Sequence, residues 1–192
     1  MRPDPAIRDA VTAVVLAGGS GARFGGADKG LVEHHGRTLA EQQLALLRAQ
    51  AARLMISANR NLERYRSFGA DVVTDLHDGF QGPLAGMHAA ASAASTPWIV
   101  CVPCDTLGVP DDAVARLVTA AGDAGVAAAY AQAADGPHYT LCALRRSLAE
   151  SLRAALLADR RTVRYFLQAQ RAAAADFQDC VLINANHAEA LA

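Results

Sequence analysis

The sequence predicts an α/β fold in which helices cover both faces of a mostly parallel β-sheet. Short apolar runs alternate along the chain with segments of helical periodicity, as expected of successive βα units. The runs are apolar at nearly every position, which is typical of strands buried on both faces. Polar residues directly follow several of these runs, and sheets of this kind bind ligands at the carboxyl ends of their strands.

The first half of the chain contains four of the predicted strands. Residues 11–16 are apolar and largely β-branched, which favours a strand. Three shorter apolar runs follow, at residues 54–58, 71–74 and 98–102. The segments between the strands predict helices at residues 39–51, 61–68 and 84–94.

The second half continues the alternation and ends with a further strand. Pro110 precedes a helix predicted at residues 111–121, because proline favours the first turn. Strands are expected at residues 126–131 and 139–144, helices at 148–157 and 162–170, and a last strand at 181–183. We expect residues 9–192 to form a single domain, preceded by a loosely ordered tail at residues 1–8.

The most informative segment is the glycine-rich stretch that follows the first strand. Residues 16–30 contain six glycines, and glycine lets backbone N–H groups approach an anion closely. Arg23 and Lys29 flank the glycines and can neutralise phosphate charge, although each could instead be a solvated loop residue. The segment therefore predicts a site for the phosphates of a nucleotide.

Two well-known phosphate loops do not fit this segment. A Walker A loop has Ser or Thr after its lysine, whereas Gly30 follows Lys29. The dinucleotide fingerprint requires glycine where Phe24 stands, and it expects an acidic residue after the second strand. That strand runs instead into Asn59-Arg60-Asn61, which disfavours a hydride-transfer enzyme.

Composition excludes other classes of function. The net charge of −1 provides no basic footprint, so we expect no nucleic-acid partner. No apolar stretch reaches the roughly 18 residues of a membrane span, so we expect no membrane partner. The histidines and serines show neither a zinc-protease nor a hydrolase motif. Cys101 and Cys104 have redox spacing, but small apolar packing in a reducing cytoplasm is the better interpretation.

Asp105 is the leading candidate for a metal ligand. It follows the fourth predicted strand, and Mg²⁺ prefers one or two carboxylates together with phosphate oxygens of the substrate. The alternative is that Asp105 caps the next helix. Asp75 follows the third strand in the same manner, and could either contact the nucleotide or cap a turn.

Several motifs together resemble one family. They are Leu16-Ala17-Gly18-Gly19, Arg23-Phe24-Gly25-Gly26, Asp28-Lys29-Gly30-Leu31, Ala58-Asn59-Arg60, Gly82-Pro83-Leu84-Ala85-Gly86, Pro103-Cys104-Asp105-Thr106 and Asn184-Ala185-Asn186. The pattern is similar to the nucleotidyltransferase superfamily and, within it, to bacterial molybdenum cofactor guanylyltransferases. This resemblance spans residues 16–186 and implies a Rossmann-like nucleotidyltransferase fold.

The resemblance implies roles for particular residues. Catalysis would involve Asp105, Lys29 and Arg23, with Mg²⁺ bound to Asp105. The nucleotide would contact Leu16, Ala17, Gly18, Gly19, Lys29, Ser57, Asp75 and Asp105. The pterin side would include Gly82, Gly86, Arg164, Asn184 and Asn186. Ser57 stands where the family often has asparagine, and it keeps a donor and an acceptor with a shorter reach.

The implied reaction transfers GMP from GTP to molybdopterin and releases pyrophosphate. The resemblance also implies contacts with molybdenum cofactor delivery proteins or apo-molybdoenzymes. Three alternatives stay open. The chain could be a related transferase that uses CTP with molybdopterin, one that joins a nucleotide to a sugar phosphate, or a GTP-binding protein that delivers the cofactor without chemistry.

Overall fold

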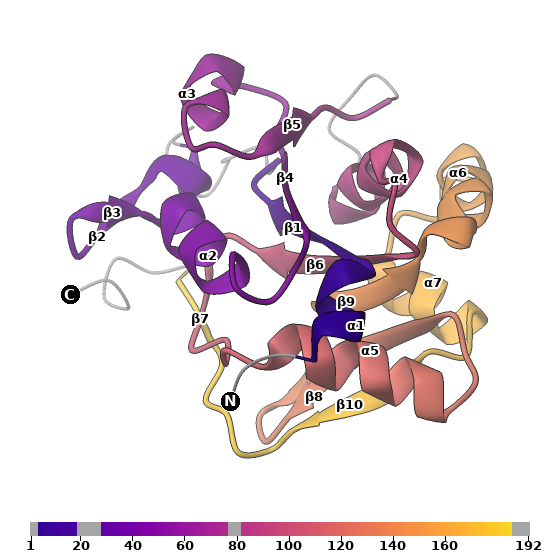
Figure 1. Ribbon diagram of the computed structural model, residues 1–192. Helices are drawn as coiled ribbons and strands as arrows, with labels where there is room; N and C mark the ends of the chain where they lie inside the picture. Colours follow the sequence, from indigo (N-terminus) through magenta and orange to yellow (C-terminus); the bar gives the residue numbers. More distant parts are fainter. Residues whose placement is uncertain (1–3, 19–27, 77–81, 186–192) are drawn as a thin grey trace.

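A seven-stranded sheet runs through the centre of the molecule in the computed structural model, which describes residues 4–18, 28–76 and 82–185 (Figure 1). The strand order is β10-β8-β9-β6-β1-β4-β5. Four adjacent strands are parallel: β5 (Asp71–Val73), β4 (Arg53–Ser57), β1 (Val11–Leu16) and β6 (Trp98–Pro103). The predicted Rossmann-like, mostly parallel sheet is therefore confirmed.

The other three strands extend the sheet beyond β6. Strand β9 (Gly136–Arg145) is antiparallel to both β6 and β8 (Ala128–Ala133). Strand β10 (Ala173–Phe177) is parallel to β8 and is the outermost strand on this side of the sheet. Since β8 and β10 run in the same direction as β6, β9 is the reversed strand of this sheet.

The parallel strands end at the same level. Leu16 at the end of β1 lies opposite both Ser57 of β4 and Pro103 of β6. Ser57 in turn lies opposite Val73 at the end of β5. The residues that follow these four strands consequently emerge side by side at one edge of the sheet, where ligands of such folds bind.

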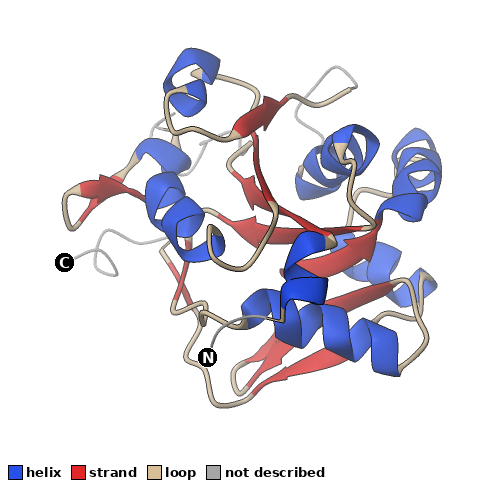
Figure 2. Ribbon diagram, in the orientation of Figure 1, coloured by secondary structure: helices blue, strands red, loops and turns tan. Residues whose placement is uncertain are grey.

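Helices cover both faces of the sheet (Figure 2). One face packs against α2 (Leu39–Leu47), α3 (Leu62–Arg66) and α5 (Ala113–Asp123), and the other against α4 (Pro83–Ala93), α6 (Ala149–Leu157) and α7 (Val163–Ala169). Neighbouring residues of β1 serve opposite faces, as the alternation of a strand requires. Val15 belongs to the core cluster beneath α2, α3 and α5, here called the first core cluster. Val14 belongs to the second core cluster, beneath α4, α6 and α7.

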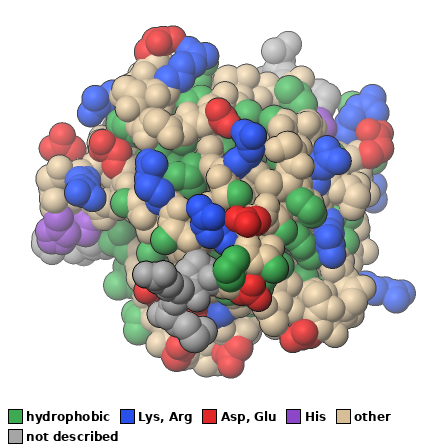
Figure 3. Space-filling view, viewed as in Figure 1, with side chains coloured by type: hydrophobic (Ala, Val, Ile, Leu, Met, Phe, Trp, Pro, Cys, Tyr) green, Lys and Arg blue, Asp and Glu red, His purple; other side chains and the backbone are tan. Residues whose placement is uncertain are grey.

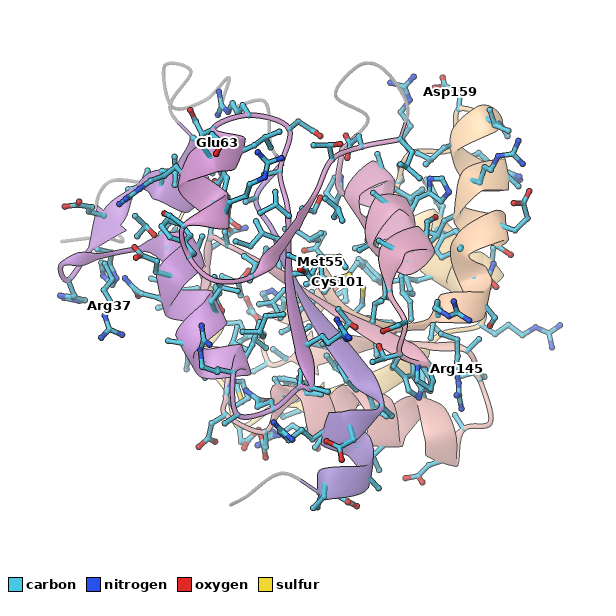
Figure 4. All side chains as sticks on the ribbon, turned by 45° about the horizontal axis from the view of Figure 1, so that its top comes forward. Arg37, Met55, Glu63, Cys101, Arg145 and Asp159 are labelled. Atoms are coloured by element: carbon cyan, nitrogen blue, oxygen red, sulfur yellow. The ribbon has the colours of Figure 1, made fainter. Side chains whose placement is uncertain are left out.

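The core has two apolar layers separated by the sheet. Met55 and Cys101 belong to the layer beneath α4, and Figure 4 shows both near the centre of the molecule. Each large apolar side chain that is fully buried contributes about 1.5–3 kcal/mol to folding. The surface seen in Figure 3 mixes Lys and Arg side chains with Asp and Glu, in line with the net charge of −1. None of the helices in the described part is long and apolar enough to span a membrane.

Short elements complete the fold. They are α1 (Pro5–Asp9), two 3₁₀ turns, η2 (Lys29–Leu31) and η3 (Arg146–Leu148), the hairpin of β2 (Glu33–His34) with β3 (Arg37–Thr38), and the antiparallel pair of β7 (Thr106–Leu107) with β11 (Ile183–Asn184). Helix α1 differs from the expected loosely ordered tail. The Asp4 side chain accepts a hydrogen bond from the Ala6 amide and caps this helix.

Strand β10 was not predicted from the sequence. Its first residues, Ala173 to Ala175, are alanines, and alanine is depleted in strands. Pairing with β8, more than forty residues earlier in the chain, places them in the sheet. The last strand was predicted, but it joins β7 instead of the central sheet.

Arg116 on α5 fastens the segment between β10 and β11. Its guanidinium donates to Asp112 at 2.8 Å and to Asp179 Oδ2 at 2.9 Å, and it lies 5.4 Å from the centre of the Phe177 ring. The hydrogen bond from Arg116 lowers the pKa of Asp179 from 3.8 to about 2. The folded state therefore favours the charged carboxylate.

We predict that Asp179→Asn lowers stability in a pH-dependent manner. Because the folded pKa of Asp179 is depressed, its contribution is present above about pH 4 and is lost as the pH falls toward 2. Urea unfolding should therefore separate the variant from the parent at pH 6 and bring them together near pH 2. The difference should also shrink in 0.5 M salt, since Asp179 is exposed and the pair is screened. An equal difference at both pH values would contradict this assignment.

Candidate functional site

The candidate site lies where the four parallel strands end. Gly18 follows β1, Asn59 follows β4, Asp75 follows β5 and Asp105 follows β6. Each comes within two residues of its strand, so the register of the sheet brings the four segments together. Three of the predicted residues lie outside the described part of the chain, namely Gly19, Arg23 and Asn186.

Lys29 and Asp105 form an ion pair at this edge. Lys29 Nζ lies 3.0 Å from Asp105 Oδ2, and the two side chains are 24% and 16% exposed. The pair joins residues 76 positions apart. Lys29 is also the only lysine among the 192 residues, which include seventeen arginines. The two described residues with predicted catalytic roles are therefore in direct contact.

The alternative that Asp105 caps a helix does not hold. Helix α5 begins at Ala113, and its N-cap is Asp112. The Asp105 carboxylate is directed to Lys29, while its backbone carbonyl accepts from the Ala185 amide at 2.7 Å. Asp105 is therefore available as an anionic group at the edge of the sheet.

Asn59 and Asp75 link the ends of β4 and β5. Asn59 Nδ2 donates to Asp75 Oδ2 at 2.8 Å, and the Asp75 amide donates to Asn59 Oδ1 at 2.9 Å. A Cβ added to Gly18 would lie 3.4 Å from Asn59 Nδ2, so the glycine segment starts in contact with this pair. The reciprocal bonds orient the Asp75 carboxylate at the edge of the sheet.

Ser57 and Gly86 pack against each other. Ser57 is 2% exposed, and a Cβ added to Gly86 would overlap Ser57 Oγ and lie 3.2 Å from Ser57 Cβ. The missing side chain at Gly86 thus lets α4 approach the end of β4 closely. The Ser57 carbonyl accepts from the Ala17 amide at 2.8 Å, which ties β4 to the start of the glycine segment. Packing accounts for glycine at position 86, while a role toward the pterin stays a prediction.

The remaining pterin-side candidates come from three separate places. Asn184 in β11 lies opposite Thr106 of β7, one residue after Asp105. Gly82 has φ +76° and caps α4, directly before Pro83. Arg164 is exposed at the second position of α7. The structure thus places Asn184 beside the Asp105 segment, although the two residues are far apart in sequence.

Gly108 is the sequence signal that could have indicated where β11 docks. It has φ +76°, and an added Cβ would overlap the carbonyl oxygen of Val181. A glycine is required here by conformation and by the close approach of the C-terminal segment. Gly108 was not among the residues predicted from the sequence.

A buried carboxylate next to Lys29 was not predicted from the sequence. The Asp28 side chain is 4% exposed, and it contacts Asn61 and Tyr65 near the start of α3. The signal available in the sequence was the direct succession Asp28-Lys29. Burial of an aspartate, however, depends on partners that are distant in the chain.

The cysteines are free thiols in the core and at the surface. Cys101 and Cys142 lie opposite each other on β6 and β9, and their hydrogen bond together with burial raises the pKa of Cys101. Burial likewise raises the pKa of Cys104. Since the thiolate is the reactive form, both groups are poor nucleophiles and act as packing residues.

The arrangement suits binding of a polyphosphate with a cation. Lys29, which belongs to the glycine-rich stretch of residues 16–30, lies against Asp105. The ammonium can bind phosphate oxygens, and the carboxylate can bind a divalent metal. The described residues contain no cluster of three or more His, Cys, Asp or Glu side chains that could hold a metal alone. A metal here would therefore take further ligands from substrate phosphate and water.

Known proteins resemble this chain over most of its length. Residues 13–175 match the family described as MobA-like NTP transferase domain. A molybdenum cofactor guanylyltransferase from Methylibium petroleiphilum is 44% identical over 184 residues, which cover 92% of this chain and 91% of that protein.

Solved structures are also similar. The molybdopterin-guanine dinucleotide biosynthesis protein A from Archaeoglobus fulgidus has a TM-score of 0.67 and 26% identity, covering 87% of this chain and 83% of that chain. The complex of Rv0371c with manganese from Mycobacterium tuberculosis shares the fold, with a TM-score of 0.64 and 20% identity over 88% of each chain.

We predict that Gly86→Ala destabilises the protein by about 1–3 kcal/mol through overlap with Ser57. At an open helical position the same change would add about 1 kcal/mol of stability. A loss of stability would therefore indicate the close contact between position 86 and Ser57. Gly86→Ala combined with Ser57→Ala should recover most of the loss, because the Oγ atom is then absent. Urea unfolding of the two single variants and the double variant tests this, and additive losses would contradict it.

Proposed function

The chain belongs to the MobA-like NTP transferase family, and we propose that it transfers GMP from GTP to molybdopterin, which yields molybdopterin guanine dinucleotide. A phosphate oxygen of molybdopterin attacks the α-phosphorus of GTP. The bond from that phosphorus to the bridging oxygen of the β-phosphate breaks, and pyrophosphate leaves. The names of the similar proteins from Methylibium petroleiphilum and Archaeoglobus fulgidus support this assignment.

The contact between Lys29 and Asp105 is the observation that carries the proposal. The ammonium and the carboxylate lie 3.0 Å apart and are only partly exposed, at the edge where the parallel strands end. On binding, the triphosphate of GTP competes with Asp105 for Lys29, because phosphate oxygens form strong charge-assisted hydrogen bonds. Lys29 and the backbone amides of the glycine segment then offset the charge that develops at the α-phosphate. We assign Arg23 the same task.

We further propose that Asp105 binds Mg²⁺ with the nucleotide. A single carboxylate with an ion-pair partner that phosphate can displace suits this cation, which prefers one or two carboxylates and several oxygens from phosphate and water. Bound there, the metal would polarise the α-phosphate and organise the leaving pyrophosphate. Asp105 would hold the cation through its carboxylate, after Lys29 has moved from Asp105 Oδ2 toward the phosphates.

The protein needs no strong general base for this reaction. The terminal phosphate of molybdopterin is already ionised at neutral pH, so positioning and charge stabilisation account for the rate. We propose that Leu16, Ala17, Gly18, Gly19, Ser57 and Asp75 bind the nucleotide with Lys29 and Asp105. Gly82, Gly86, Arg164, Asn184 and Asn186 are proposed for the pterin side.

The proposal extends to the setting of the reaction. The four cysteines of the protein are all free thiols, as is usual in a reducing compartment. GTP is available as a substrate in the cytoplasm. We therefore assign the chain to the cytoplasm. The dinucleotide product would pass to a cofactor delivery protein or to an apo-molybdoenzyme.

Pyrophosphate release tests the proposed function. The protein is incubated with GTP or CTP and Mg²⁺, each with and without molybdopterin. We expect release that requires both GTP and molybdopterin and that stops when EDTA is added. Release with CTP but not with GTP would show that the protein transfers CMP instead of GMP. GTP binding without pyrophosphate release would indicate a delivery protein.

We predict that Asp105→Asn lowers pyrophosphate release about 100-fold or more, because the amide lacks the charge that holds a cation. The Mg²⁺ concentration for half-maximal rate should rise as well. Asp111→Asn provides the matched control, since Asp111 is exposed just before α5. Near-normal release by Asp105→Asn would refute the metal assignment.

A further inference from the structure

The buried carboxylate of Asp28 lies directly before Lys29 in the chain. The Asp28 side chain is only 4% exposed. A carboxylate in such a position is costly unless it is paired and hydrogen-bonded. Its partners should therefore be fixed parts of the structure, and they show what the carboxylate holds in place.

All the described partners of the carboxylate come from residues 60–65, which precede α3 and form most of it. Tyr65 Oη donates to Asp28 Oδ1 at 2.6 Å, and Asn61 Nδ2 donates to Oδ2 at 3.0 Å. Arg60 Nε lies 3.6 Å from Oδ2. The Asp28 carboxylate thus joins the backbone next to Lys29 to three side chains of residues 60–65.

Tyr65 is the most deeply buried of these partners. It is fully buried in the first core cluster, and its ring meets Phe68 edge-on at 5.8 Å. Burial and the Asp28 carboxylate raise the pKa of Tyr65, so its hydroxyl stays protonated and donates to the carboxylate. A hydrogen bond to a charged acceptor is stronger than one between neutral groups.

The chain on the other side of Lys29 is held by the same tyrosine. A Cβ added to Gly30 would overlap the Tyr65 hydroxyl and lie 3.1 Å from Ala17 Cβ. The Leu31 amide donates to the Asp28 carbonyl at 3.0 Å, and the Val32 amide to the Lys29 carbonyl at 3.1 Å. The backbone of Lys29 is therefore fixed on both sides, and its side chain reaches from this base to Asp105.

We propose that Asp28 and Tyr65 are positioning residues, which clamp the backbone of Lys29 to α3 and thereby direct its ammonium to the site where Asp105 and the phosphates bind. Neither side chain needs to touch substrate. The consequence for turnover rests on the proposed function, whereas the consequence for Lys29 in the free protein does not.

The single lysine of the chain makes a direct test possible. Protein labelled with ¹³C,¹⁵N-lysine gives one lysine side-chain spin system, that of Lys29. In the parent protein we expect its signals to be displaced from those of free lysine by Asp105. In Tyr65→Phe, which removes only the hydroxyl, and in Asp28→Asn, they should move toward the free-lysine position. Asn61→Gly removes one weaker contact, tolerates the left-handed backbone at φ +52°, and should shift them less.

Thr96→Ala is the control for a loss of stability alone. Thr96 Oγ1 is a buried group that bonds the Thr12 hydroxyl at 2.7 Å and the Trp98 carbonyl at 2.9 Å, at the opposite edge of the sheet from Lys29. This variant should lose stability while the lysine signals stay in place. With GTP and molybdopterin, kcat/KM should fall about 10- to 100-fold in Tyr65→Phe and Asp28→Asn, but not in Thr96→Ala.

Unchanged lysine signals in folded Tyr65→Phe and Asp28→Asn would overturn the proposal, as would an equal displacement in Thr96→Ala. If the parent protein releases no pyrophosphate, the proposed function fails while the lysine signals still decide the positioning role. If turnover is normal in the parent and the signals move in Tyr65→Phe with no loss of kcat/KM, the positioning role in catalysis is refuted.

Discussion

The register of four parallel strands is the constraint on which the site depends. Leu16 lies opposite both Ser57 and Pro103, so polar residues that follow separate strands emerge at one level. A slip of one residue in any strand would turn its side chains to the other face and displace the polar group after it. The two apolar layers maintain this register, because β1 has nearly all of its side chains buried between them.

The charged groups at this edge are held in two different ways. Lys29 and Asp105 are half-buried and face each other, so each can exchange its partner for a nucleotide or a cation. Asp28 is buried and bonded to Tyr65 and Asn61, so it stays where it is. Adjacent residues thus have different proposed tasks: the buried Asp28 carboxylate positions the backbone, and the partly exposed Lys29 ammonium exchanges Asp105 for the phosphates of a ligand. The difference in burial separates the two roles.

The C-terminal part of the chain completes the site from outside the central sheet. Arg116 fastens residues 177–179 to α5, and Gly108 leaves room for the backbone at Val181. Strand β11 then pairs with β7, and the Ala185 amide bonds the Asp105 carbonyl. Asn184 is therefore held beside the proposed metal ligand by contacts that span more than sixty residues.

Local pattern alone was sufficient for the elements with a strong signal. The strand at Val11–Leu16 and the helix that begins at Pro83 follow from hydrophobicity and from proline, which act within a few residues. The family resemblance implied catalytic roles for Lys29 and Asp105 separately, and their contact was found in the tertiary structure. Strand β10, the contact of Ser57 with Gly86 and the burial of Asp28 required the tertiary structure. An alanine run has little preference of its own, and neither the burial of a carboxylate nor the close packing of a glycine is decided before a distant segment of the chain arrives.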